Sequence, residues 1–293
     1  MIVEPWTIDG SGGEPIRGDA HPPTRAPARA AALIVHGFKG YKDYGFIPLL
    51  ARELAGDSPL AVHRFNLSHA GVGADPSTFE RPDLFERDTW RTQADDIRTV
   101  MTAAYEGRLP HTPPGLPIVL IGHSRGGTAC ILCAGRAFRD DEPVKPSMVV
   151  TVSAPEAADT MSDDQRALLL DRGWIDSPSS RTGQQLRVGR DWLQQQIDHP
   201  DDHDVQAMRA RIGCPMVAVL GQEDDVVPAD DAVQLVSRHE NVIPVVIEGA
   251  DHVWNTPNPA DPAAPLSEQL RTLLDAVRMH LALSGVLAPA SAS

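Results

Sequence analysis

The residues with the clearest chemical potential form the segment Gly122-His123-Ser124-Arg125-Gly126-Gly127. The segment follows the strand-like run PIVLI and precedes the helix-like run TACILCAGRAF, so Ser124 is expected at a sharp turn from strand to helix. Glycines at 122 and 126 would let neighbouring backbone pass without a Cβ clash. The hydroxyl would lie at a helix N-terminus, which stabilises developing negative charge. The pattern therefore predicts a nucleophilic serine.

The base and the acid that such a serine requires are expected later in the chain. A serine hydroxyl is a weak nucleophile at neutral pH and needs a general base, which a carboxylate must orient. After a serine at such a turn, the acid follows a later strand and the histidine follows the last one. Asp224 in LGQEDDVVP fits the acid, with Asp225 and Glu223 as rivals, and His252 in GADHVW fits the base. We expect Ser124, Asp224 and His252 to form a catalytic triad.

Two backbone N–H groups are candidates for stabilising the oxyanion that forms when a serine attacks a carbonyl. One is the N–H of Arg125, the residue after the nucleophile. The other is expected in the loop His36-Gly37-Phe38-Lys39-Gly40, which follows an early strand-like run. Phe38 is the first choice in this loop and Lys39 the second.

The elements that must position these residues alternate along the chain. Apolar runs typical of buried parallel strands occur at 31–35, 60–65, 117–121, 148–152, 216–220 and 242–247. Helical patterns lie between or after them, at about 45–55, 88–106, 125–138, 229–239 and 266–283. Two further extended stretches, at 2–8 and 15–20, flank a Gly-rich turn and indicate a hairpin. The alternation predicts an α/β fold with a mostly parallel central sheet flanked by helices.

One interval breaks this alternation. Residues 154–214 are far longer than a simple crossover between strands, and they hold helical patterns at 163–171, 190–197 and 204–211. We expect a small helical cap inserted between late strands. The predicted organisation is then a core of residues 1–153 and 215–283, a cap at 154–214 and a flexible C-terminal tail at 284–293.

Composition limits the possible partners and location. The chain has 293 residues and a formal charge of 26 − 40 = −14, which disfavours binding to nucleic acid or to an anionic membrane surface. Three cysteines in a chain of this length do not resemble a secreted disulfide framework, and no apolar run is long enough for a membrane span. We expect a cytoplasmic protein acting on a small molecule, with a homodimer as a possible assembly.

The motifs HGFKGYKDYGF, FNLSHAGVG, GHSRGG, LGQEDDVVP and GADHVW together resemble the α/β-hydrolase superfamily over residues 30–283. Within it, the chain is similar to bacterial serine hydrolases related to dienelactone hydrolases and serine aminopeptidase-type hydrolases. The resemblance implies the triad and the oxyanion donors named above. The chain departs from dienelactone hydrolases, which have a cysteine where Ser124 stands, and from epoxide hydrolases and haloalkane dehalogenases, which have an aspartate there.

The expected function is cleavage of a carboxylic ester through an acyl-enzyme, with no metal or organic cofactor. A peptidase or amidase and a thioesterase are alternatives on the same triad. An alternative of another class is a hydrolase fold that only binds a ligand or partner. Side chains expected near the substrate pocket are Lys39, His69, Trp174, Trp192 and Trp254.

Overall fold

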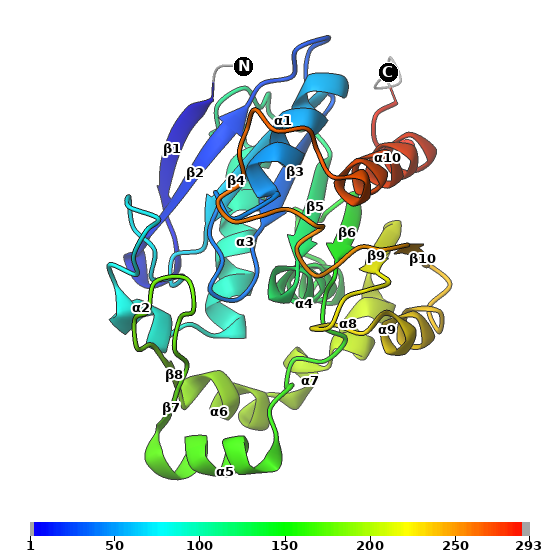
Figure 1. Cartoon of the computed structure of the whole chain (residues 1–293). Coiled ribbons are helices and arrows are strands. Elements are labelled where there is room, and N and C mark those ends of the chain that lie inside the picture. Colours follow the sequence, from blue (N-terminus) through cyan, green and yellow to red (C-terminus); the bar gives the residue numbers. More distant parts are fainter. Residues whose placement is uncertain (1–2, 289–293) are drawn as a thin grey trace.

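A computed structural model describes residues 3–288 and contains a sheet of eight strands with helices on both faces (Figure 1). The order of strands across the sheet is β1-β2-β4-β3-β5-β6-β9-β10. The strands of this sheet are β1 (Glu4–Asp9), β2 (Pro15–His21), β3 (Ala30–Val35), β4 (Leu60–Asn66), β5 (Ile118–His123), β6 (Met148–Val152), β9 (Met216–Gly221) and β10 (Val242–Ile247). Strands β1 and β2 pair antiparallel, β2 pairs antiparallel with β4, and the remaining pairs are parallel. The prediction of a mostly parallel sheet preceded by a hairpin is confirmed.

Helices cover both faces of this sheet and bury its apolar side chains. The helices outside residues 154–214 are α1 (Ile47–Asp57), α2 (Pro82–Glu86), α3 (Trp90–Tyr105), α4 (Arg125–Arg139), α9 (Ala229–Val236) and α10 (Glu268–Leu283), with a short 3-10 helix η1 (Ser11–Gly13) in the hairpin turn. Alternate residues of β3 belong to different cores: Leu33 packs in the cluster that includes α3 and α4, and Ile34 in the cluster that includes α1 and α10. Burial on both faces explains why the strands read as continuous apolar runs.

Residues 154–214, which we call the insertion, lie at the end of the sheet opposite the two chain termini (Figure 1). The insertion contains α5 (Asp163–Arg172), β7 (Trp174–Asp176), β8 (Arg187–Gly189), α6 (Asp191–Asp198), α7 (Pro200–His203) and α8 (Val205–Arg211). Its three longer helices match the sequence patterns. The antiparallel pair of β7 and β8 was not predicted, because three residues are too few to show a strand period.

The C-terminal segment differs from the flexible tail that we expected. Residues 284–288 form turns, and Val286 is buried against the cluster that includes α1 and α10. Residues 289–293 lie outside the described part of the chain. Within residues 3–288, no helix has the length and apolar character to cross a membrane.

Candidate active site

Ser124 lies between β5 and α4 in a backbone conformation that few side chains adopt. Its φ of 52° and ψ of −131° are outside the regions favoured by L-residues, so the turn is strained. Close backbone packing requires the flanking glycines: a Cβ on Gly122 would lie 2.4 Å from the carbonyl oxygen of Gly126. A Cβ on Gly126 would lie 2.4 Å from the carbonyl oxygen of His36. The turn therefore has the local structure that the sequence predicted.

The structure brings Ser124, His252 and Asp224 into one hydrogen-bonded chain. The Ser124 Oγ atom is 3.1 Å from His252 Nε2, and His252 Nδ1 is 2.9 Å from Asp224 Oδ2. A carboxylate only accepts hydrogen bonds, so the proton of the neutral imidazole belongs on Nδ1. Nε2 is then free to accept the proton of the serine hydroxyl, as a general base must.

Asp224 is the carboxylate that contacts the histidine, whereas its neighbours Glu223 and Asp225 are exposed. Asp224 is buried, and its Oδ1 also accepts hydrogen bonds from the N–H groups of Val226 at 2.9 Å and Val227 at 2.8 Å. Burial alone would raise the pKa of this carboxyl. The hydrogen bonds from His252 and Val227 outweigh that effect and lower the pKa below its ordinary value, which keeps the carboxylate ionised at neutral pH.

His123 supports the loop that carries His252. Its Nε2–H donates to the carbonyl oxygen of His252 at 2.8 Å, and the two rings lie 4.9 Å apart. Burial lowers the pKa of His123 to about 3, so the ring is neutral under ordinary conditions. The strand β5 thus positions the serine directly and the base loop through this hydrogen bond.

The two predicted oxyanion donors are placed beside the nucleophile with their N–H groups available. Neither the Phe38 N–H nor the Arg125 N–H has an acceptor among the described residues. The loop after β3 comes so close to the serine that a Cβ on Gly37 would lie 2.8 Å from the Ser124 Cβ. Such proximity is what two donors directed at one oxygen require.

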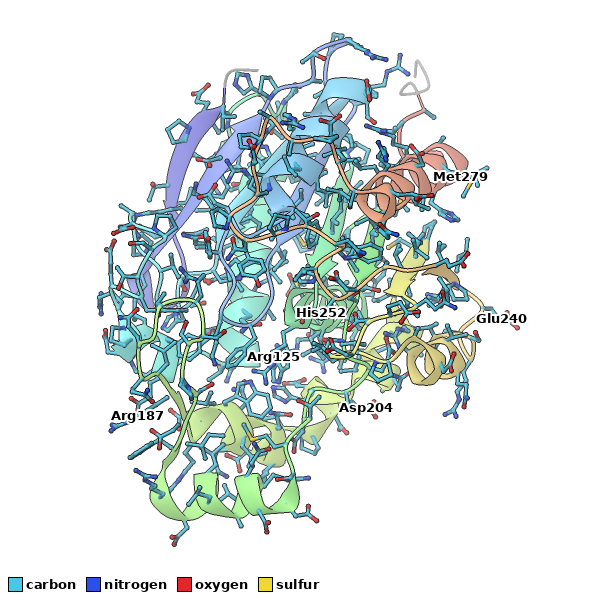
Figure 2. All side chains as sticks on the ribbon, in the orientation of Figure 1. Arg125, Arg187, Asp204, Glu240, His252 and Met279 are labelled. Carbon is cyan, nitrogen blue, oxygen red and sulfur yellow. The ribbon has the colours of Figure 1, made fainter. Side chains whose placement is uncertain are left out.

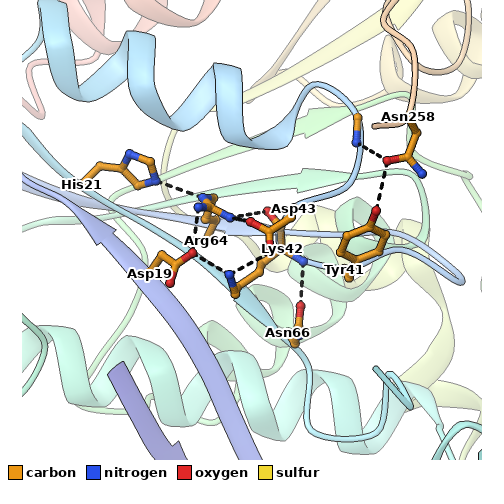
Figure 3. Close-up of polar contacts among 9 residues, drawn as sticks. Asp19, His21, Tyr41, Lys42, Asp43, Arg64, Asn66 and Asn258 are labelled. Carbon is orange, nitrogen blue, oxygen red and sulfur yellow. Dashed lines mark hydrogen bonds and ion pairs between the residues drawn. The ribbon is translucent and has the colours of Figure 1, made fainter. Parts of the chain in front are cut away.

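A partly buried cluster of charges anchors the loop after β3 (Figure 3). Lys42 Nζ donates to Asp19 at 2.6 Å and to Asp43 at 2.8 Å, and Arg64 pairs with the same two carboxylates. Arg64 Nε also donates to His21 Nε2 at 3.0 Å. Two cations and two anions balance one another here, so these charges are compensated and the loop is held in place.

Two asparagines fix the backbone of the same loop (Figure 3). The Asn66 Oδ1 atom accepts from the Lys42 N–H at 2.7 Å. The Asn258 Oδ1 atom accepts from the Tyr41 hydroxyl at 3.1 Å and from the Gly45 N–H at 3.0 Å. Asn258 follows the base loop in the chain, so these bonds connect the segments that carry Phe38 and His252.

A cavity of about 560 Å³ opens onto the serine and the histidine. We call its two sides the core wall and the insertion wall. The core wall consists of Phe38, Ser124, Arg125, Val226, Val227, Pro228, Ala232 and His252, and the insertion wall consists of Pro155, Glu156, Ala157 and Thr160. Figure 2 labels Arg125 and His252 in the region between the strand ends and the insertion. Most of the lining is apolar, as in pockets for small organic ligands.

None of the five residues expected in the pocket is among the described side chains that line this cavity. Trp254 is fully buried in the core cluster that includes α1 and α10. Trp192 is buried beneath the Arg125 guanidinium and beside Trp90. Trp174 on β7 stacks instead with arginine side chains of the insertion. These tryptophans bury their apolar area in packing, and the expectation that they line the pocket is corrected.

Lys39 and His69 also lie outside the cavity lining. Lys39 Nζ donates to the carbonyl oxygen of Pro178 at 2.8 Å, so it connects the loop after β3 to the insertion. His69 is buried, with its Nδ1 2.8 Å from the Ser68 Oγ. One sequence signal could have identified part of the insertion wall. Pro155 to Ala157 follow the end of β6, and ligands of α/β sheets bind beyond the carboxyl ends of the strands.

Comparisons with known proteins agree with this fold. The sequence profile described as the alpha/beta hydrolase family matches residues 32–266, and the chain belongs to that family. No curated protein is significantly similar to the chain in sequence.

Solved structures with the same fold include several esterases. Est1E from Butyrivibrio proteoclasticus with bound ferulic acid has a TM-score of 0.69 at 20% identity, covering 95% of this chain and 98% of that one. The esterase domain from a Rhodothermus marinus protein has a TM-score of 0.63 at 18% identity, covering 96% and 98%. Dienelactone hydrolase from Anabaena variabilis has a TM-score of 0.59 at 15% identity, also covering 96% and 98%. The chain is a hydrolase of this fold.

Proposed function

We propose that the protein is a serine hydrolase that cleaves carboxylic esters through an acyl-enzyme. The observation that carries the proposal is the chain of contacts from Ser124 Oγ to His252 Nε2 and from His252 Nδ1 to Asp224 Oδ2, at 3.1 Å and 2.9 Å. The esterases among the structural neighbours support an ester as the substrate.

In the acylation half-reaction, the Ser124 hydroxyl gives its proton to His252 Nε2 while Oγ forms a bond to the ester carbonyl carbon. The carbonyl oxygen becomes an oxyanion that accepts hydrogen bonds from the N–H groups of Phe38 and Arg125. The imidazolium then donates its proton to the leaving alcohol as the carbon–oxygen ester bond breaks. Asp224 holds the imidazole orientation and stabilises its positive charge throughout.

In the deacylation half-reaction, water attacks the acyl-enzyme carbonyl and transfers its proton to His252 Nε2. The second oxyanion forms in the same place, and its collapse releases the carboxylic acid and returns the proton to Ser124 Oγ. These steps use only water and groups of this chain.

The charges of the cavity lining favour an ester over the amino-terminal peptide that an aminopeptidase would take. Of the described side chains that line the cavity, Arg125 alone carries a charge with no paired counter-charge, and that charge is positive. A protonated amine would be repelled by it. A peptidase function has no comparable support in this cavity.

A panel of substrates tests the proposal. Wild type should hydrolyse p-nitrophenyl esters faster than a matched thioester or an aminoacyl p-nitroanilide. Ser124→Ala should lower ester hydrolysis by at least about 1,000-fold, because the nucleophile is lost. The exposed Ser237 offers a matched control, and Ser237→Ala should behave as wild type. Ester hydrolysis that persists in Ser124→Ala, or faster cleavage of the anilide, would contradict the proposal.

A further inference from the structure

Arg125 lies on the lining of the cavity, next to the nucleophile. It is the first residue of α4, directly after Ser124, and it lines the cavity together with the serine and the histidine. Its Cζ atom lies 4.0 Å from the centre of the Phe38 ring and 5.1 Å from that of Trp192. Two aromatic side chains thus hold the guanidinium in place.

This guanidinium forms no hydrogen bond or ion pair with any residue in the described part of the chain. Two buried arginines of the protein behave differently: Arg64 pairs with Asp19 and Asp43, and Arg209 pairs with Glu156. Contacts with aromatic faces use the π surface of a guanidinium and leave its in-plane N–H donors free. Those donors have the planar, forked arrangement that binds a carboxylate through two parallel hydrogen bonds.

The two carboxylates whose charges act on the Arg125 guanidinium, Asp88 and Asp159, are bonded to other groups. Asp88 accepts hydrogen bonds from Thr92 at 3.2 Å and Gln93 at 2.6 Å. Burial raises the pKa of Asp88 to about 7 although the Gln93 hydrogen bond opposes the shift, so much of its negative charge is lost near neutrality. Asp159 pairs with Arg166 at 3.2 Å. Neither residue supplies Arg125 with a bonded counter-charge.

Arg125 remains a cation in this setting. Burial lowers its pKa to about 10, which still leaves it protonated at neutral pH. Glu156 is the other charged residue on the lining, but its carboxylate is paired with Arg209. An anion that enters the cavity would therefore find one positive charge without a bonded counter-charge, in a lining that also includes apolar side chains such as Val226 and Val227.

We propose that the Arg125 guanidinium binds a carboxylate carried by the substrate, so that the preferred esters have an anionic acyl or alcohol part. The apolar lining indicates a hydrocarbon spacer between the ester and this carboxylate. The inference rests on the proposed esterase function because it assigns the substrate class of the same site.

Two pairs of substrates distinguish the two positions of the carboxylate. For the acyl side, p-nitrophenyl monoadipate is compared with p-nitrophenyl hexanoate. For the alcohol side, para-acetoxybenzoate is compared with para-acetoxybenzamide. Wild type should prefer the anionic member of at least one pair by about 10- to 100-fold in kcat/KM, the effect of a hydrogen-bonded charge pair. The pair that shows the preference identifies the side of the ester that carries the carboxylate.

Variants of Arg125 test whether its side chain causes the preference. Arg125→Met should abolish the preference for the anionic substrate, and Arg125→Lys should reduce it to a few-fold, since an ammonium keeps the charge but loses the fork. The matched control is Arg187→Met, because Arg187 also stacks on an aromatic ring, that of Trp174, but is exposed and outside the cavity (Figure 2). Circular dichroism spectra that match wild type would show that each variant is folded.

The outcomes separate this inference from the proposed function. Equal use of anionic and neutral esters by wild type, or the same preference in Arg125→Met, overturns the carboxylate site while leaving the esterase in place. If no ester is hydrolysed, the proposed function fails, and calorimetric titration with adipate decides the inference by itself. Adipate binding that weakens at least 10-fold in Arg125→Met supports the site, and binding that is absent or unchanged contradicts it.

Discussion

The two walls of the cavity differ in how their side chains are fixed. On the core wall, Ser124 and His252 follow strand ends and are held by hydrogen bonds to each other, to Asp224 and to His123. The insertion wall is a stretch of irregular backbone after β6, and its Ala157 and Thr160 present short side chains. The contrast indicates that the hydrogen-bonded groups of the core wall carry out the reaction, whereas the insertion wall adjusts the size of the substrates that fit.

The largest effect is expected for a change behind the core wall. Asp224→Asn should lower kcat for ester hydrolysis by about 1,000- to 10,000-fold, because an amide no longer stabilises the imidazolium or its productive tautomer. The matched control is Asp225→Asn, an exposed neighbour that should keep kcat within about two-fold of wild type. Steady-state kinetics on one p-nitrophenyl ester would measure both variants, and a larger loss in Asp225→Asn would refute the assignment of the acid.

A smaller effect, on the free energy of unfolding, concerns buried histidines of the protein. Burial lowers the pKa of His36 to about 4 and those of His63 and His123 to about 3, from an ordinary value of 6.5. As the pH decreases, these residues therefore bind protons at a higher pH in the unfolded chain than in the folded chain. The free energy of unfolding should fall as the pH decreases from about 6.5 towards 4, by up to about 1.4 kcal/mol per pH unit for each histidine.

Urea denaturation at several pH values would measure this loss of stability. His63→Gln should make the decline shallower, because the variant lacks one of these buried imidazoles. His199→Gln is the control, since His199 is exposed and should leave the slope unchanged. A free energy of unfolding that is constant between pH 6.5 and 4.5 would contradict the account of these buried rings.

The smallest effect is expected for the insertion wall. Ala157→Leu would add bulk to the cavity and should lower kcat/KM for a hexanoyl ester relative to an acetyl ester by about 10-fold, the usual scale for apolar pocket contacts. The equivalent change on the exposed face of α5, Ala167→Leu, should leave the ratio unchanged. If the ratio of kcat/KM for the hexanoyl and acetyl esters is unchanged in Ala157→Leu, the proposed role of the insertion wall in substrate choice is contradicted.

The same contrast separates what the sequence could predict from what it could not. Strands buried on both faces produce continuous apolar runs, and a serine between Gly122 and Gly126 at a strand end is typical of a nucleophile at a strained turn. The order of elements then predicted Asp224 and His252, and in the structure His252 contacts both Ser124 and Asp224. Asp224 was favoured over its rivals Asp225 and Glu223, but the sequence alone could not exclude them, because the choice depends on how the loop after β9 directs each carboxylate.

The residues that line the pocket could not be predicted from the sequence, for a different physical reason. An apolar side chain such as Trp192 or Trp254 can pack in a core or face a ligand, and only tertiary structure decides between them. Whether the Arg125 guanidinium has a bonded counter-charge likewise depends on residues distant in the sequence, such as Asp88 and Asp159. Such long-range contacts leave no periodic pattern in the sequence.

Intact-mass analysis after fluorophosphonate treatment tests the central claim, an activated Ser124, most directly. A fluorophosphonate phosphonylates a serine whose proton is removed by an adjacent base, independently of which ester the protein prefers. The structure predicts a single adduct on wild type and none on Ser124→Ala. An unmodified folded wild type, or an equal adduct on both proteins, would contradict the claim that Ser124 is the nucleophile.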